Sequence, residues 1–185
     1  MALDLELGPL RGLVGVWEGD AGIDVAFMHS KGEIGEQAFR ERATFSPFGP
    51  VDNGDQALYG LDYRTAAWRP EDEDPFHTEV GYWLWDGAAG QVMRCFMVPR
   101  GSTILAGGAA HADDTRFTLQ AEVGSETYGI LSNIYLARAA RTVLYQVTVE
   151  ISGETFSYES TTTIEHARTP EPLEHTDRNV LRRVE

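Results

Sequence analysis

Apolar and polar residues alternate along most of this chain after residue 35, and helical spacing of apolar residues is confined to the first dozen positions. The clearest example is the segment 142–151, in which every second residue is apolar or aromatic. Ser152 and Gly153 then provide a turn, and the alternation resumes over 155–164. Because successive side chains of a β-strand point to opposite faces, the two segments predict a β-hairpin.

Further alternating segments raise the predicted total to ten or eleven strands; they cover 15–27, 37–46, 57–66, 76–85, 91–98, 102–107, 114–122, 128–137 and 174–184. Short connections between consecutive strands favour an up-and-down meander, and a meander of this length avoids exposed edges by closing on itself. We therefore expect an all-β fold, a single antiparallel up-and-down β-barrel of about ten strands of the lipocalin and fatty-acid-binding (calycin) type. Such a barrel encloses room for a small ligand.

The first residues differ from the rest because leucines recur there at helical spacing. Leu5, Leu7, Leu10 and Leu13 predict a short helical turn that covers one end of the barrel. A chain of 185 residues with 42% apolar content is the usual size of one domain. We expect a single domain over 1–185, with a lid segment at 1–13 and the barrel at 14–185.

Trp17 stands between Gly15 and Gly19 at the start of the first strand. Glycines at these positions let another strand approach the indole closely. If the first and last strands pair, the guanidinium of Arg182 or Arg183 can stack on Trp17 and close that end of the barrel. The alternative is that Trp17 is ordinary core and both arginines are solvated.

The segment 76–85 is aromatic on both faces of the predicted strand. His77 shares one face with Glu79 and Trp83, whereas Tyr82 belongs to the other face. If the His77 face points inward, imidazole, carboxylate and indole line a pocket suited to an aromatic ligand. If it points outward, the exposed tryptophans form an apolar patch that marks an interface. A homodimer through the exposed face of this strand is one expectation.

The charge of the chain narrows the possible partners. Acidic residues outnumber basic ones by 29 to 15, and the net charge of −14 repels nucleic acid and anionic lipid. We expect neither as a partner, and no membrane insertion, since no apolar run is long enough. Cys95 is the lone cysteine and lies in an apolar run, which favours a reducing, cytoplasmic location.

Three segments of the sequence resemble the nitrobindins, a family of haem-binding β-barrels. The first, Gly15-x-Trp17-x-Gly19, is similar to the family's glycine-tryptophan-glycine signature, with Ala21 where the next glycine is expected. The second spans 76–83 and is similar to the family's His-x-Glu-x-Gly-Tyr strand. The third spans 172–184 and resembles the closing strand. Together they extend over nearly the whole chain.

This resemblance implies haem b inside the barrel, with His175 as the axial iron ligand and His77, Tyr82 and Trp83 around the cofactor. It also implies binding of nitric oxide and isomerisation of peroxynitrite. However, this chain has one more residue between His175 and Arg182 than the family pattern. Either a bulge absorbs that residue and His175 points inward, or His175 faces solvent, paired with Asp177.

Two other functions compete with haem binding. The same barrel can carry a fatty acid or another small hydrophobic ligand, held by arginine and tyrosine side chains that converge on its carboxylate. The candidates for that clamp are Arg40, Arg42, Arg94, Tyr82 and Tyr145. Alternatively, His77 and Glu79 lie two residues apart on one face and can act as an acid–base pair in an enzyme without haem.

Overall fold

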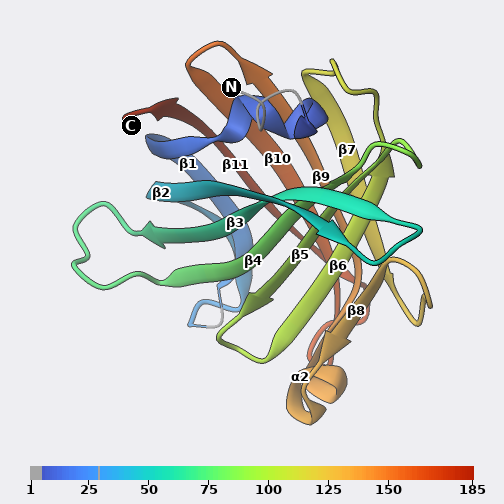
Figure 1. Cartoon of the computed structure of the whole chain (residues 1–185). Coiled ribbons are helices and arrows are strands. Elements are labelled where there is room, and N and C mark those ends of the chain that lie inside the picture. The colour runs from blue at the N-terminus through green and yellow to red at the C-terminus, as the bar shows by residue number, and fades with distance from the viewer. Residues whose placement is uncertain (1–5, 29) are drawn as a thin grey trace.

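The computed structural model describes residues 6–28 and 30–185, and its strands close into one barrel (Figure 1). The all-β closed barrel is therefore confirmed. The eleven strands are β1 (Gly15–Met28), β2 (Glu33–Asp52), β3 (Ala57–Trp68), β4 (His77–Asp86), β5 (Gln91–Val98), β6 (Ser102–Ala109), β7 (Arg116–Val123), β8 (Gly129–Ser132), β9 (Ala140–Ser152), β10 (Thr155–His166) and β11 (Leu173–Arg183).

The barrel departs from a pure up-and-down meander at one place. Around the wall the strands run β9-β7-β8-β6, and the short β8 pairs in parallel with β7. The predicted strand 128–137 is wrong in its second half, because Ile134–Ala139 forms the helix α2. The side chain of Asn133 accepts a hydrogen bond from the backbone N–H of Leu136 at 3.0 Å, and such a cap favours a helix start.

One end of the barrel is closed by the 3₁₀ helix η1 (Gly8–Leu13), which lies across the opening at the top of Figure 1. Leu7, Leu10 and Leu13 are fully buried there. These leucines therefore plug the barrel as a lid of apolar side chains. The predicted lid residue Leu5 lies outside the described residues.

The seam between the first and last strands is held by Trp17 and Arg183. These residues face each other across the β1–β11 pairing, and the guanidinium carbon lies 4.3 Å from the centre of the indole ring. Arg183 also donates hydrogen bonds to the carbonyls of Val14 and Gly12, and Trp17 Nε1 donates to Leu13 at 2.7 Å. Cation–π stacking and these bonds tie the chain's last strand to its lid. The neighbouring Arg182 points outward and is exposed.

A bulge in β1 explains the displaced glycine of the sequence signature. Between Gly19 and Gly22, β1 has one residue more than the facing part of β2, and its register also shifts against β11. Because of this bulge, Gly22 and not Ala21 occupies the inward-facing position of β1, where a Cβ atom would lie 2.5 Å from the ring of Phe39. Gly19 is held equally tightly, since a Cβ there would lie 2.6 Å from the carbonyl oxygen of Val180.

Candidate functional site

The barrel encloses a cavity of about 460 Å³ that opens at the end opposite η1, where α2 and the loop after β5 lie. A volume of this size suits a small organic ligand. Its walls are largely aromatic and aliphatic, from Phe39, Phe45, Tyr63, Phe96, Tyr145, Val147, Phe156 and Ile164. Charged side chains interrupt these walls at two levels, one near the opening and one deeper in the barrel.

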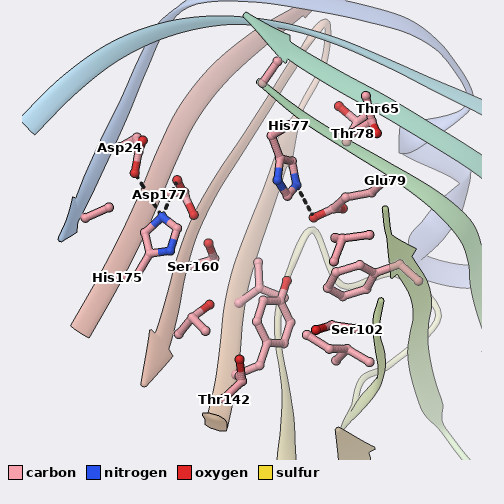
Figure 2. A pocket seen from close by; sticks show the side chains of 18 of the residues that line it. Asp24, Thr65, His77, Thr78, Glu79, Ser102, Thr142, Ser160, His175 and Asp177 are labelled. Atoms are coloured by element: carbon pink, nitrogen blue, oxygen red, sulfur yellow. Dashed lines mark hydrogen bonds and ion pairs between the residues drawn. The ribbon is translucent and has the colours of Figure 1, made fainter. Parts of the chain in front are cut away.

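His175 points into the cavity near its opening (Figure 2). It shares the inner face of β11 with Asp177, Asn179 and Leu181, and β11 pairs with β10 without a break in register. Of the two alternatives, His175 therefore points inward, and it does so without a bulge in β11 against β10. The irregularity in this part of the barrel is in β1, which has one residue more than the facing part of β11 between Glu18 and Ile23.

The imidazole of His175 is bound by two carboxylates. Its Nε2 lies 2.9 Å from Asp24 Oδ1 and 3.4 Å from Asp177 Oδ1. Burial works to lower the pKa of His175, but the hydrogen bonds to Asp177 and Asp24 outweigh it and raise the pKa to about 10. The other oxygen of Asp24 pairs with Arg69 at 2.6 Å. His175 is therefore an imidazolium at neutral pH in this arrangement.

The same three side chains are a possible metal-ligand set. One donor atom each from Asp24, His175 and Asp177 lie within 4.8 Å of one another. Imidazole and carboxylate ligands suit several divalent cations. Arg69 already forms an ion pair with Asp24, and its positive charge would repel a metal cation bound at this site.

A second charged group lies on the opposite wall, around Glu79 of β4. Glu79 binds the guanidinium of Arg94, accepts a hydrogen bond from Tyr63 at 2.5 Å and lies 3.0 Å from His77 Nε2. Burial would raise the pKa of Glu79, but the charge of Arg94 and the bond to His77 lower it to about 2. Arg94 also donates to the hydroxyls of Tyr63 and Tyr145.

Glu41 is a third buried acid in the cavity wall, and it has only neutral partners. Its carboxylate accepts hydrogen bonds from Thr65 and Tyr158 at 2.8 Å and from Asn179 at 3.0 Å. Burial raises the pKa of Glu41, and the nearby charge of Glu79 adds to the shift. Sequence reasoning missed Glu41, because its hydrogen-bond donors come from β3, β10 and β11, far away in the chain.

The structure brings some of the expected site residues together and separates others. His175, His77 and Trp83 all line the cavity. Tyr82 does not: its side chain is on the outer face of β4, 50% exposed and packed against Phe48. The reason is the alternation itself, since neighbours in a strand cannot both point inward.

A closed barrel with one open end, a mostly apolar cavity and an imidazole on its wall defines a small-molecule-binding β-barrel. Comparison with known families gives a narrower answer. The profile described as "THAP4-like, heme-binding beta-barrel domain" matches residues 6–183. The chain therefore belongs to this family, that of the nitrobindins.

Solved structures agree on the fold. The crystal structure of Rv2717c from M. tuberculosis is similar with a TM-score of 0.67 at 19% sequence identity, over 97% of this chain and 98% of that one. No match was found among curated protein sequences. Within the described part of the chain, no helix is long and apolar enough to cross a membrane.

Proposed function

We propose that this barrel binds haem b in its cavity, with His175 as the axial ligand of the iron. The observation that carries the proposal is the place of His175: it is an inward imidazole on the cavity wall of a protein that belongs to a haem-binding barrel family. Histidine is a common axial ligand of haem iron. The aromatic walls provide the apolar surroundings that a porphyrin ring requires.

The donor groups near His175 fit an anionic, largely apolar cofactor. Arg69 lines the cavity, and its side chain is partly exposed although its Nη2 binds Asp24. A guanidinium at this place suits a carboxylate such as a haem propionate. Haem binding requires that Asp24 and Asp177 release His175 Nε2, because both carboxylates contact this atom, which would bind the iron.

The chain's own contribution would be to bind, orient and shield the cofactor. His175 Nε2 must lose its proton and leave both carboxylates before its lone pair is available. Phe39 and Ile164 exclude water on the cavity walls, and the lid closes the far end. Bound haem would supply the chemistry toward nitric oxide and peroxynitrite, and a narrow cavity would limit access to small molecules.

Titration with haemin tests this proposal. We expect a Soret band shifted from that of free haemin in the wild-type protein, and its loss in His175→Ala. His77→Ala is the matched control, because His77 also lines the cavity but lies on the opposite wall. The proposal fails if haemin gives no shift, or if His175→Ala keeps it.

A haem-free carrier of a small apolar ligand is the second candidate function, and the Arg94 cluster favours a neutral ligand over a fatty acid. Arg94 and Tyr145 do converge in the cavity, as a carboxylate clamp requires, but Glu79 already occupies the guanidinium. A free fatty acid would bring a second carboxylate beside Glu79. Native mass spectrometry of the untreated protein would reveal such a cargo as added mass.

A further inference from the structure

Four side chains with hydroxyl groups line the cavity, and they are Ser102, Thr142, Ser160 and Thr162. They come from β6, β9 and β10, and Figure 2 shows Ser102, Thr142 and Ser160 around the same space as His175. Within the described residues none of the four hydroxyls has a hydrogen-bond partner, and none is fully enclosed by protein atoms. These hydroxyls are therefore available to a molecule inside the cavity.

Two of the hydroxyls lie beside the charged residues of β11. In the β10–β11 pairing, Ser160 is directly opposite Asp177, and Thr162 is directly opposite His175. All four residues line the cavity, and directly opposite side chains on one face of a sheet have Cβ atoms about 5 Å apart. One small polar group of a ligand can therefore contact Ser160 and Asp177 together.

Asp177 is the more accessible of the two carboxylates that hold His175. Asp24 is almost completely buried, and its two oxygens pair with His175 at 2.9 Å and with Arg69 at 2.6 Å. Asp177 approaches His175 only to 3.4 Å, through Oδ1, and its side chain is 28% exposed. Within the described part of the chain, Asp177 Oδ2 has no partner, so it can accept a hydrogen bond from a ligand.

The chemistry of these two side chains selects a neutral hydroxyl group. A carboxylate only accepts hydrogen bonds, whereas the hydroxyl of Ser160 can donate and accept. A ligand hydroxyl can donate to Asp177 and accept from Ser160, and in this way it replaces the bonds that water makes there. An anionic group at this place would lie beside the carboxylate of Asp177, and a cationic group would lie beside the imidazolium of His175.

We propose that the cavity binds a neutral aromatic ligand with a hydroxyl group, and that this hydroxyl donates a hydrogen bond to Asp177 and accepts one from Ser160. A hydrogen bond from a hydroxyl to a carboxylate is charge-assisted and roughly twice as strong as a neutral one. The rings of Phe39 and Tyr145 line the same cavity and suit a flat ligand. This inference rests on the proposed ligand-binding role of the cavity but does not require haem.

Three naphthalene derivatives of matched shape test the inference on the purified 185-residue protein. 2-Naphthol has a hydroxyl that donates and accepts, 2-methoxynaphthalene has an oxygen that only accepts, and 2-methylnaphthalene has neither. By calorimetry we expect 2-naphthol to bind about tenfold more tightly than each of the other two, the effect of one hydrogen bond to a charged group. Burial of apolar surface alone would give the opposite order, because 2-naphthol is the most polar of the three.

Asp177→Asn keeps the shape of the side chain but removes its charge. We expect this variant to bind 2-naphthol about fivefold more weakly, whereas 2-methylnaphthalene binds as before. Haemin affinity should change in the opposite direction, because Asp177 contacts the nitrogen that iron would need. Asp113→Asn, in the loop after β6, makes the same chemical change at an exposed position and is the matched control.

Ser160→Ala removes the second partner of the ligand hydroxyl. We expect a loss of about threefold in 2-naphthol affinity, since the bond from Ser160 is a neutral one. Ser157→Ala is the matched control, because Ser157 is on the same strand but does not line the cavity. Thermal denaturation of all the variants verifies that they fold.

The inference is overturned if 2-naphthol and 2-methoxynaphthalene bind equally, if none of the three derivatives binds, or if folded Asp177→Asn protein keeps the full preference for 2-naphthol. The wild-type comparison decides this even if neither cavity variant folds. The haemin titration has an independent outcome. A Soret shift without a preference for 2-naphthol leaves the haem proposal intact, whereas the preference without a Soret shift supports a haem-free carrier.

Discussion

The two ends of this barrel are filled by opposite kinds of side chain. At the η1 end, Leu7, Leu10, Leu13, Trp17 and Leu181 are fully buried and pack as an apolar plug. At the open end, Asp24, Arg69, His175 and Asp177 pair with one another around the cavity. Apolar burial stabilises a fold directly, whereas buried ion pairs contribute little net stability. The plug therefore serves the fold, and the charged groups are best explained by ligand binding.

Among substitutions in the apolar plug, Trp17→Ala should reduce the stability of the protein most. This change removes a fully buried indole and the surface on which Arg183 stacks. We expect a loss of about 3–5 kcal/mol of unfolding free energy, the usual cost of truncating a core tryptophan. Chemical denaturation measures it, and Trp17→Phe should cost clearly less because it keeps an aromatic ring. A loss for Trp17→Ala below about 1 kcal/mol would contradict the role of the seam.

Among the charged residues deeper in the cavity, Glu79 is the carboxylate partner of Arg94. Glu79→Gln should destabilise the protein by about 3 kcal/mol at neutral pH, because it leaves the buried guanidinium of Arg94 without its carboxylate. The pKa of Glu79 is lowered from 4.5 to about 2, so its contribution is complete above pH 4.5 and declines as the pH falls toward 2. Urea denaturation at several pH values should therefore show a difference in unfolding free energy between wild type and variant that narrows as the pH falls below 4.5. A difference that widens below pH 4.5 would contradict this assignment.

Asp177→Asn sharpens the comparison at the cavity opening. Asp177 contacts the Nε2 atom that haem iron would need. Removing this charge should raise haemin affinity about fivefold, the equivalent of one modest hydrogen bond. Soret titration measures it, with Asp113→Asn, an exposed residue of the loop after β6, as the surface control. Weaker binding in Asp177→Asn would show that this carboxylate supports the ligand instead of competing with it.

The smallest expected effect is that of Tyr82→Ala. Tyr82 is on the outer face of the wall whose inner face carries Trp83. Haemin should bind within about twofold of wild type, since outward substitutions leave cavity contacts unchanged. A larger change in affinity would mean that the outer face of β4 influences ligand binding in the cavity.

Much of the barrel could be predicted from local patterns. Alternation identified most strands, and the turn expected at Ser152-Gly153 falls at the end of β9, with Gly153 and Glu154 between β9 and β10. The local signal failed at 133–139, where Asn133 starts a helix inside a predicted strand. The parallel pairing of β7 with β8 depends on contacts along the barrel wall, and no local pattern encodes it.

The site was less predictable, because its partners are distant in the chain. His77 and Glu79 are two residues apart and could be placed on one face from the sequence. In contrast, Asp24 meets His175 across 151 positions, and Glu41 meets Asn179 across 138. Only the closure of β1 against β11 creates these contacts. Arg94 was one of several clamp candidates, but its pairing with Glu79 could not be predicted, because the β4–β5 register places Arg94 opposite Trp83, four residues from Glu79.

The seam between β1 and β11 also has a consequence for biosynthesis. β1 begins at Gly15, but its partner β11 is the strand Leu173–Arg183, far later in the chain. The ring of hydrogen bonds therefore cannot be completed until β11 has left the ribosome. Until then β1 has an open edge that other chains could pair with. Truncation within β11 should therefore affect the yield of soluble protein more than cavity substitutions do.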